Sequence, residues 1–240
     1  MTDPSDLSAE TPSDRPPGPI SRVRRPKSAA RDRYDALSTW YDVLAEPFEA
    51  PARSAGLAML GVRPGERVLD VGCGTGSALV DLARSVAPDG TAVGIDVADG
   101  MCRSSEAALA VDSLGRGAVV RADAAATPFP DDSFDALFAS FVLELFDTPE
   151  IPAVLEEWRR VLEPDGRCCV VSLSRRDVGV STRLYELVHR VVPELVDCRP
   201  IYLRDTVLEC GFRIVAHRTS TVWRLPVEIV VCEPDGSLDG

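Results

Sequence analysis

The chain has 240 residues, of which 45% are hydrophobic and 27% charged, an average composition for a globular protein with a full core. Its 38 acidic and 26 basic residues give a net charge of −12, which disfavours binding to the phosphate backbone of nucleic acids. No apolar run approaches the ~20 residues that span a bilayer. The seven cysteines contain no CxxC pair, so the sequence predicts a cytoplasmic protein without a metal site.

The N-terminal part differs from the rest of the chain. Residues 1–28 hold six prolines and no aromatic residue, so we expect a disordered tail. Residues 29–240 are expected to form a single domain. From Arg31 onward apolar residues recur at helical spacing, and residues 48–60 continue the apolar pattern, so helices are expected to precede the first strand.

Beyond residue 66, short apolar strands alternate with amphipathic helices, which predicts a parallel sheet with helices on both faces. Thr148 followed by Pro149 is typical of a helix start, and Asp165-Gly166 is typical of a turn. Strands are expected at 67–71, 91–96, 118–121, 134–140, 167–173, 212–218 and 221–231. Helices are expected at 77–86, 99–114, from 148 onward, 180–192 and 203–210.

The first strand leads into the glycine-rich segment 72–76, and in such sheets ligands bind beyond the carboxyl ends of the strands. Glycines let the backbone approach a ligand closely, and the following helix directs its positive end to the same place. Asp96 lies at the end of the second strand, where an acid can accept hydrogen bonds from both ribose hydroxyls. Asp123, just after the third strand, is placed to accept from an exocyclic amine of a base.

A nicotinamide-dependent oxidoreductase is the rival interpretation of this loop. The dinucleotide fingerprint requires G-x-G-x-x-G, whereas residues 72–76 read G-x-G-x-G. Asp70 also lies two residues before the first glycine and would repel a pyrophosphate, whereas a ligand with an ammonium and a sulfonium would be attracted. The spacing therefore disfavours NAD.

Taken together, these motifs resemble the class I S-adenosylmethionine (SAM)-dependent methyltransferases, in particular the branch with the ubiquinone and menaquinone biosynthesis enzymes. The segments that carry the resemblance are 68–76, 94–96 with Met101, 123–135 and 160–166. The resemblance implies an α/β, Rossmann-like, doubly wound sheet of seven strands in the order 3-2-1-4-5-7-6, with strand 7 antiparallel. It also implies a helical lid at the N-terminus.

The same resemblance implies SAM as the cofactor and S-adenosylhomocysteine (SAH) as the product. The glycine-rich loop would hold the methionine part, Asp70 its ammonium and Asp96 the ribose. Further expected contacts are those of Val97 and Met101 with the adenine ring, of Asp123 and Ala124 with its polar edge, and of the Ser140 backbone with the methionine amine. The full set of residues expected to bind the cofactor is Tyr34, Tyr41, Asp70, Gly72, Cys73, Gly74, Thr75, Gly76, Asp96, Val97, Met101, Asp123, Ala124 and Ser140.

The segment after the fourth strand is expected to meet the methyl acceptor. Residues 141–146 are mostly apolar where the quinone enzymes tend to carry an Arg-Asn pair, which disfavours a quinone acceptor. Glu144 is the candidate general base, with a helix-surface carboxylate as the alternative interpretation. Phe141 and Tyr185 are expected to contact the acceptor.

The predicted function is transfer of a methyl group from SAM to a small or lipid-like acceptor by in-line displacement. The alternative is a protein of the same fold that binds SAM but acts as a non-methylating enzyme or a binding module, because fold alone does not determine chemistry. The expected partner is a small molecule, with no nucleic acid, and a homodimer is left open.

Overall fold

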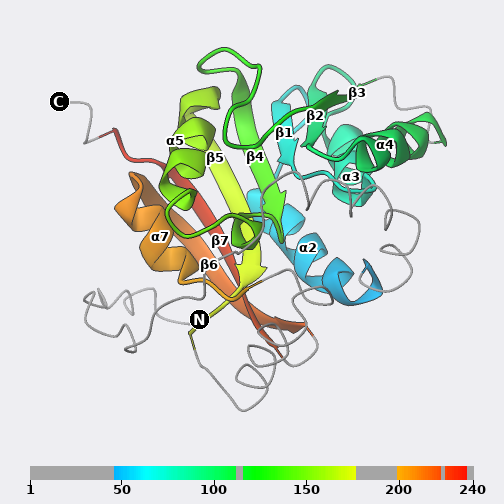
Figure 1. Ribbon diagram of the computed structural model, residues 1–240. Coiled ribbons are helices and arrows are strands. Elements are labelled where there is room, and N and C mark those ends of the chain that lie inside the picture. The colour runs from blue at the N-terminus through cyan, green and yellow to red at the C-terminus, as the bar shows by residue number, and fades with distance from the viewer. Residues whose placement is uncertain (1–45, 112–115, 177–198, 223–224, 237–240) are drawn as a thin grey trace, which may run out of the picture.

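In the computed structural model, which describes residues 46–111, 116–176, 199–222 and 225–236, one seven-stranded sheet forms the centre of the molecule (Figure 1). The strand order is β3-β2-β1-β4-β5-β7-β6, as the resemblance implied. The strands are β1 (Arg67–Val71), β2 (Thr91–Asp96), β3 (Gly117–Arg121), β4 (Phe134–Ser140), β5 (Leu162–Leu173), β6 (Phe212–Val222) and β7 (Leu225–Pro234).

Strands β3, β2, β1, β4 and β5 are parallel, and β7 runs antiparallel between β5 and β6. Because the order reverses between β1 and β4, the carboxyl ends of these two neighbours open a position for a ligand. The predicted fold class is therefore confirmed, and the loops after β1, β2, β3 and β4 all leave the same edge of the sheet.

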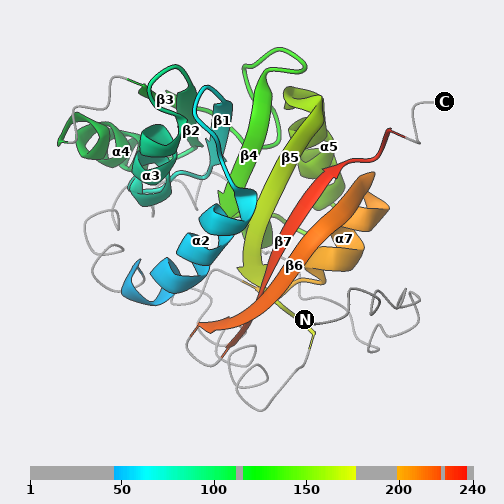
Figure 2. The same ribbon diagram turned by 180° about the vertical axis from the view of Figure 1, so that it is seen from behind.

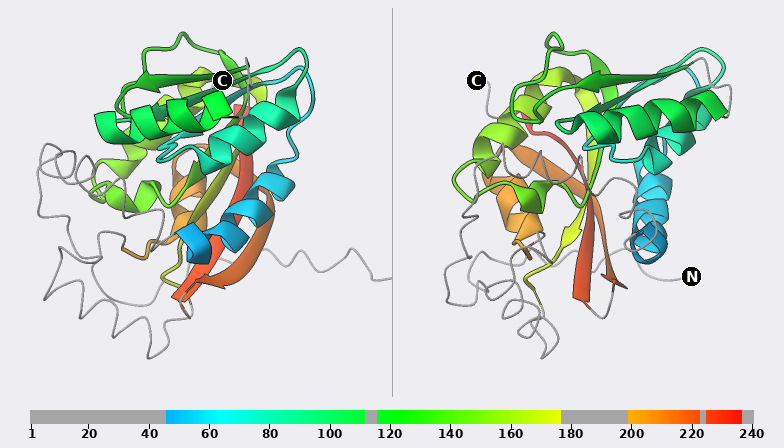
Figure 3. Two further views of the ribbon diagram at one scale, coloured as in Figure 1. Left: turned by 90° about the vertical axis from the view of Figure 1, so that its right-hand side faces the viewer. Right: turned by 45° about the vertical axis from the view of Figure 1, so that its right-hand side comes forward.

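Helices cover both faces of the sheet (Figures 1 and 2). The helices α2 (Glu46–Leu60), α3 (Ser77–Val86) and α4 (Asp99–Val111) contribute Leu60, Leu79 and Leu109 to one apolar cluster. On the other face, α5 (Ile151–Val161) and α7 (Leu203–Glu209) contribute to the second cluster. With the molecule turned, α2 lies on one side of the sheet and α5 and α7 on the other (Figure 3).

Three predicted boundaries are wrong. Thr148-Pro149 does not begin a helix: residues 148–150 form a turn and α5 begins at Ile151, because the Thr148 hydroxyl accepts a hydrogen bond from Arg199 instead of capping a helix. β5 was expected at 167–173 after a turn at Asp165-Gly166, but it begins at Leu162, whose backbone pairs with Phe134, and it includes both residues of the expected turn.

The third wrong boundary concerns the last two strands. Thr221 was expected to open the final strand, but it belongs to β6 and pairs with Pro226 of β7. Val222 of β6 and Leu225 of β7 lie opposite each other.

Other expectations fall outside the part of the chain that the structure describes. These are the tail at 1–28, the N-terminal lid and the helix at 180–192. In the described ranges, no helix has the length and apolar character needed to cross a bilayer.

Candidate functional site

The loop between β1 and α3 is built around three glycines with left-handed backbone: Gly72 (φ +64°), Gly74 (φ +54°) and Gly76 (φ +95°). A Cβ on Gly72 would lie 2.4 Å from the Cγ2 of Val142, and one on Gly76 would lie 2.9 Å from the Cα of Ser105. Both glycines are therefore required by conformation and by space. They bring the backbone close to the segment after β4 and to α4.

Hydrogen bonds from two neighbouring elements fix the shape of this loop. The backbone N–H of Gly74 donates to Asp96 Oδ2 at 3.1 Å, and the Ser105 hydroxyl donates to the Gly74 carbonyl at 2.9 Å. The Cys73 N–H donates to the Ile95 carbonyl at 2.9 Å. Burial raises the pKa of the Cys73 thiol, which keeps it protonated and suits a packing role. Because both the N–H and the carbonyl of Gly74 have a hydrogen-bond partner, the loop is held in a defined conformation.

Asp96 lies at the end of β2 and is half-buried. In addition to its bond from Gly74, its Oδ1 accepts from the backbone N–H of Ala98 at 2.8 Å. A carboxylate offers about four lone-pair directions on its two oxygens, so it can accept from several donors at once. This geometry is compatible with the predicted ribose contact.

Asp70, in β1, is a buried carboxylate facing the same region. It is 2% exposed, and burial is the main reason that its pKa rises from 3.8 to about 8. The positive charge of Arg53 on α2 opposes this increase, and the negative charge of Asp96 adds to it. The Oδ2 atom has no hydrogen-bond donor among the described residues. A cationic group next to Asp70 would therefore satisfy this oxygen and favour its charged form.

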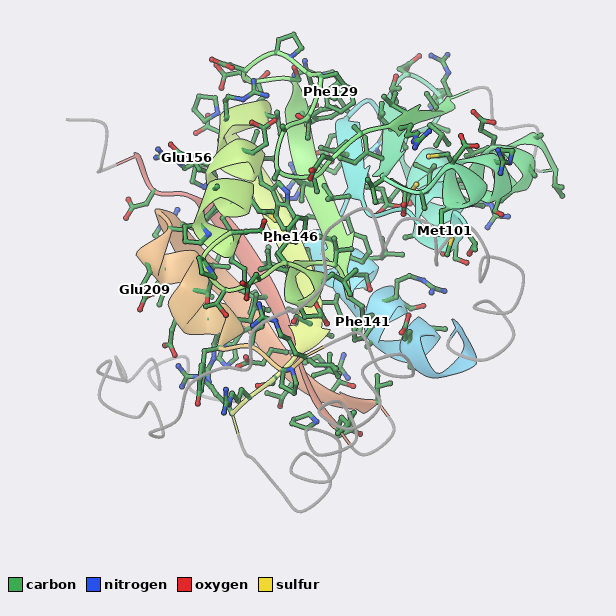
Figure 4. All side chains as sticks on the ribbon, viewed as in Figure 1. Met101, Phe129, Phe141, Phe146, Glu156 and Glu209 are labelled. Carbon is green, nitrogen blue, oxygen red and sulfur yellow. The ribbon has the colours of Figure 1, made fainter. Side chains whose placement is uncertain are left out.

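On the other side of the loop lie the apolar and polar groups that were predicted to contact an adenine ring. Val97 is 38% exposed, and Met101 is buried at the start of α4 (Figure 4). The Asp123 Oδ1 accepts from the Ala125 N–H at 3.0 Å. The indole Nε1 of Trp158 donates to the Ala124 carbonyl at 3.1 Å, so α5 fixes the loop after β3.

The segment after β4 presents Phe141 and Glu144. Phe141 has a left-handed backbone (φ +57°), and its N–H donates to the Val171 carbonyl of β5 at 2.8 Å. Figure 4 shows Phe141 and Met101 near the same edge of the sheet, whereas Phe129 lies at the opposite edge. Ser140, half-buried, ends β4. The left-handed residue turns the chain directly into a short 3-10 helix, η2 (Leu143–Leu145).

The alternative interpretation of Glu144 as a surface carboxylate is wrong. Its side chain is fully buried, because η2 carries it into the end of β5, where Oε1 accepts from the Leu173 N–H at 3.1 Å. Burial raises its pKa from 4.5 to about 7, against the lowering by the Leu173 and Glu144 N–H groups and the Ser172 hydroxyl. The negative charge of Glu49 on α2 adds to the increase. The structure thus holds a carboxyl group near the cofactor loop that can change charge near neutral pH.

The structure brings together the predicted residues of four loops. It also shows three residues near them whose contacts the sequence patterns did not reveal. The missed residues are Arg53, which faces Asp70, Ser105, which holds the glycine loop, and Trp158, which holds Ala124. Trp158 was visible as part of a buried helical stripe, but the partner of its N–H was not. The candidates Tyr34, Tyr41 and Tyr185 lie outside the described residues. Among those described, no group of His, Cys, Asp and Glu side chains is arranged to hold a metal ion.

Comparison with known proteins agrees with this architecture. A family model described as a methyltransferase domain matches residues 68–166. The chain is 32% identical to a demethylmenaquinone methyltransferase of Geobacillus kaustophilus over 174 residues, which cover 72% of each chain. It is 42% identical to the nocamycin O-methyltransferase of Saccharothrix syringae over 134 residues, which are 56% of this chain but only 47% of that relative. The match thus spans about half the length of the nocamycin enzyme.

Solved structures show the same fold. The crystal structure of the [4+2]-cyclase SpnF superposes with a TM-score of 0.71, covering 90% of this chain and 97% of that one at 18% identity. The 3-2-1-4-5-7-6 sheet, the glycine-rich loop after β1 and the acid at the end of β2 define a Rossmann-like fold, a class in which nucleosides bind at this end of the strands. With the sequence match over most of the length of a relative, the chain belongs to the class I SAM-dependent methyltransferase family.

The residues at the site fit the cofactor that the family name implies. The glycine-rich loop has no room for Cβ atoms at Gly72 and Gly76. The buried Oδ2 of Asp70 is suited to a cation. A cation would hold Asp70 in its charged form, whereas a pyrophosphate would oppose that charge, which agrees with the glycine spacing that disfavours NAD.

Proposed function

We propose that this chain binds SAM across the carboxyl ends of β1, β2 and β3 and transfers its methyl group to a small, largely apolar acceptor. The observation that carries the proposal is the pair of carboxylates beside the glycine loop. Asp96 is bonded to the Gly74 N–H, and Asp70 is buried close enough for the two charges to interact. Such a site favours a ligand that has positive charge at one end and vicinal hydroxyls in the middle.

In this proposal the cofactor contacts follow the order of the strands. The loop from Gly72 to Gly76, with Cys73 and Thr75, surrounds the methionine part, and Asp70 pairs with its ammonium. Asp96 accepts from the ribose hydroxyls. The remaining contacts are those of Val97 and Met101 with the adenine faces, of Asp123 and the Ala124 N–H with the adenine edge, and of the Ser140 backbone with the amine.

SAM supplies a methyl group that is already activated by the positive charge on sulfur. The acceptor's lone pair forms the new bond to the methyl carbon as the C–S pair returns to sulfur. The protein therefore has to align the acceptor, exclude water and, for a hydroxyl, remove one proton. The buried residues after β4, including Phe141, are suited to excluding water.

Glu144 is the group we assign to proton removal. Its Oε1 is occupied by the Leu173 N–H, while Oε2 has no donor among the residues described and would take the proton. A base with a pKa of about 7 is partly ionised at neutral pH and still basic enough to accept from a polarised hydroxyl. We therefore propose an acceptor that is methylated on oxygen. The name of the nocamycin O-methyltransferase, given for that relative, is consistent with this proposal.

The second candidate is a non-methylating protein, because the [4+2]-cyclase SpnF shares this fold. SAH release with a panel of apolar phenols and enols, compared with amines and thiols of similar size, separates the two. O-methylation predicts SAH formation with hydroxyl acceptors, and a loss of about 100-fold in Glu144→Gln. Binding of SAM without SAH formation from any member of the panel would favour the non-methylating alternative. Equal turnover in wild type and Glu144→Gln would remove the role of Glu144.

A further inference from the structure

A buried arginine supports the loop that carries Glu144. Arg199 is 1% exposed, and its guanidinium donates to the Thr148 hydroxyl at 2.7 Å and to the Phe146 carbonyl. Both acceptors lie within four residues of Glu144 on the chain, directly after η2. Burying a guanidinium costs several kcal/mol, which hydrogen bonds to its donors offset in part, so these two bonds favour one position of the loop.

The backbone next to Arg199 is attached to the same strand end that holds Glu144. The Ile201 N–H donates to the Leu173 carbonyl at 3.0 Å, and the Arg175 N–H donates to the Ile201 carbonyl at 2.9 Å. The N–H of the same Leu173 donates to Glu144 Oε1. Leu173 is thus the common attachment point of two segments: the strap 199–201 through its carbonyl, and the carboxyl group of Glu144 through its N–H.

Arg199 connects the strap to the residues that follow η2. The strap is bonded to β5, β5 is bonded to Glu144, and Arg199 reaches from the strap to the residues that follow Glu144. Without the guanidinium, η2 would keep its own turn, the packing of Leu143 and the bonds of Glu144 at the end of β5, but it would lose its attachment to the strap. A loop held from one side is expected to move and to admit water to the Glu144 carboxyl.

We propose that Arg199 is a positioning residue, which fixes η2 from the strap 199–201 and so holds the Glu144 carboxylate, dry and in place, at the carboxyl end of β5. This inference rests on the proposed function, in which Glu144 is the base. Arg199 itself touches neither acceptor nor cofactor in this account. Its effect on turnover passes entirely through the position and hydration of Glu144.

The test follows the titration of Glu144 directly, without any acceptor. Infrared spectra of the full chain labelled with 13C-carboxyl glutamate are recorded against pH, and the signal missing in Glu144→Gln identifies the residue. Glu49 is the other carboxyl group whose charge acts on Glu144, so its titration is followed in the same spectra. Wild type is expected to titrate near pH 7.

The informative variant is Arg199→Met, which keeps the apolar stem and removes every donor. We expect the Glu144 midpoint to fall by about one pH unit or more, because a hydrated carboxyl returns toward its ordinary value of 4.5. The direction of the shift is decisive. Loss of a nearby positive charge alone would raise the midpoint, so a rise or an unchanged midpoint in folded protein would overturn the proposal.

Two further variants keep the experiment interpretable. Arg176→Met removes a partly buried arginine that pairs with Asp205 of α7, and it is expected to leave the Glu144 midpoint unchanged. If Arg199→Met does not fold, as judged by circular dichroism, Thr148→Val removes only one of the two acceptors and is expected to lower the midpoint by a smaller amount. An unchanged midpoint in folded Thr148→Val would then overturn the proposal.

Turnover distinguishes failure of this inference from failure of the proposed function. With a phenol that wild type methylates, Arg199→Met is expected to lower kcat about tenfold or more, with little change in the KM for SAM. Arg199→Lys is expected to recover part of the loss. Full activity in Glu144→Gln would reject the base while leaving the titration result standing. A loss confined to Glu144→Gln, with Arg199→Met like wild type, would reject only the role of Arg199.

Discussion

The Asp96 carboxylate and the Gly74 backbone N–H are joined by a 3.1 Å hydrogen bond, although Asp96 ends β2 and Gly74 lies in the loop after β1. The acid at the end of β2 therefore orders the glycine loop after β1, and in the proposed function it also accepts from the ribose hydroxyls. Substitutions at Asp96 should for this reason affect both the loop and the cofactor.

Asp96→Asn keeps the size of the side chain and removes its charge. We expect the affinity for SAH to fall about 10- to 100-fold, since hydrogen bonds to charged groups contribute about 1.5–3 kcal/mol. Titration calorimetry measures this affinity, and circular dichroism checks the fold. Asp99→Asn is the matched control: Asp99 is three residues away, pairs with Arg103 at the surface and should bind SAH like wild type. Unchanged affinity in Asp96→Asn would refute the ribose assignment.

Proton release should accompany cofactor binding at Asp70. Its pKa of about 8 leaves it largely protonated at pH 7, and the ammonium of SAH favours the charged form. Calorimetry in phosphate and in Tris, whose ionisation heats differ, should show close to one proton released per SAH at pH 7 and an affinity that increases up to about pH 8. Asp70→Asn should abolish the release. The same proton release in that variant would place the titrating group elsewhere.

The same carboxyl group makes the stability of the cofactor-free protein depend on pH. The folded state holds a proton that the unfolded chain has lost between pH 3.8 and about 8, so the free energy of unfolding should decrease as pH rises through this window. Urea unfolding of Asp70→Asn should show a flatter dependence than wild type over the same range. A slope that is identical in the two proteins would contradict the shift.

Gly72 should not tolerate a side chain, because an added Cβ would contact Val142. A smaller residue at position 142 should relieve this contact. Gly72→Ala places a Cβ 2.4 Å from Val142 Cγ2, and we expect about 1–3 kcal/mol more destabilisation than for Gly65→Ala. Gly65 is the matched control because it also has a left-handed backbone but no atom near the added Cβ. Thermal unfolding of Gly72→Ala with Val142→Ala should recover part of the loss, and an additive double variant would count against the contact.

Trp158 should act on the cofactor through Ala124. Trp158→Phe removes the indole N–H and leaves the Ala124 carbonyl without its donor, which is expected to cost about 1–3 kcal/mol of stability and to weaken SAH binding. Phe212→Leu removes ring volume from the same apolar cluster without touching the loop after β3. It should lower the melting temperature while leaving SAH affinity unchanged. Equal effects of both variants on affinity would mean that Trp158 acts only through packing.

Much of this architecture could be predicted from the sequence because the signals are local. The expected bounds of β1, β2, α3 and β4 match the structure. Apolar runs and helical spacing determine such elements, and the motifs of the resemblance determine their order. Asp96 and the glycines were recognisable because their roles depend on position along a strand or loop.

What the sequence did not reveal depends on contacts between distant segments. Glu144 follows an apolar strand in a pattern equally suited to an exposed helix, and only the left-handed turn at Phe141 and the approach of Leu173 bury it. Arg53 lies on α2 and Asp70 on β1, and nothing in the segment around Arg53 indicates that its charge acts on a carboxylate. Thr148 has the residue type of a helix cap, but a buried arginine from far along the chain takes its hydroxyl.

The most direct measurement is a crystal structure of the full chain with SAH. The account predicts that the adenosyl group lies over the Gly72–Gly76 loop, with both ribose hydroxyls within hydrogen-bond distance of Asp96 and the ammonium beside Asp70. It also predicts that the sulfur faces the segment that carries Glu144. Density for SAH away from this loop, or a ribose that does not contact Asp96, would contradict it.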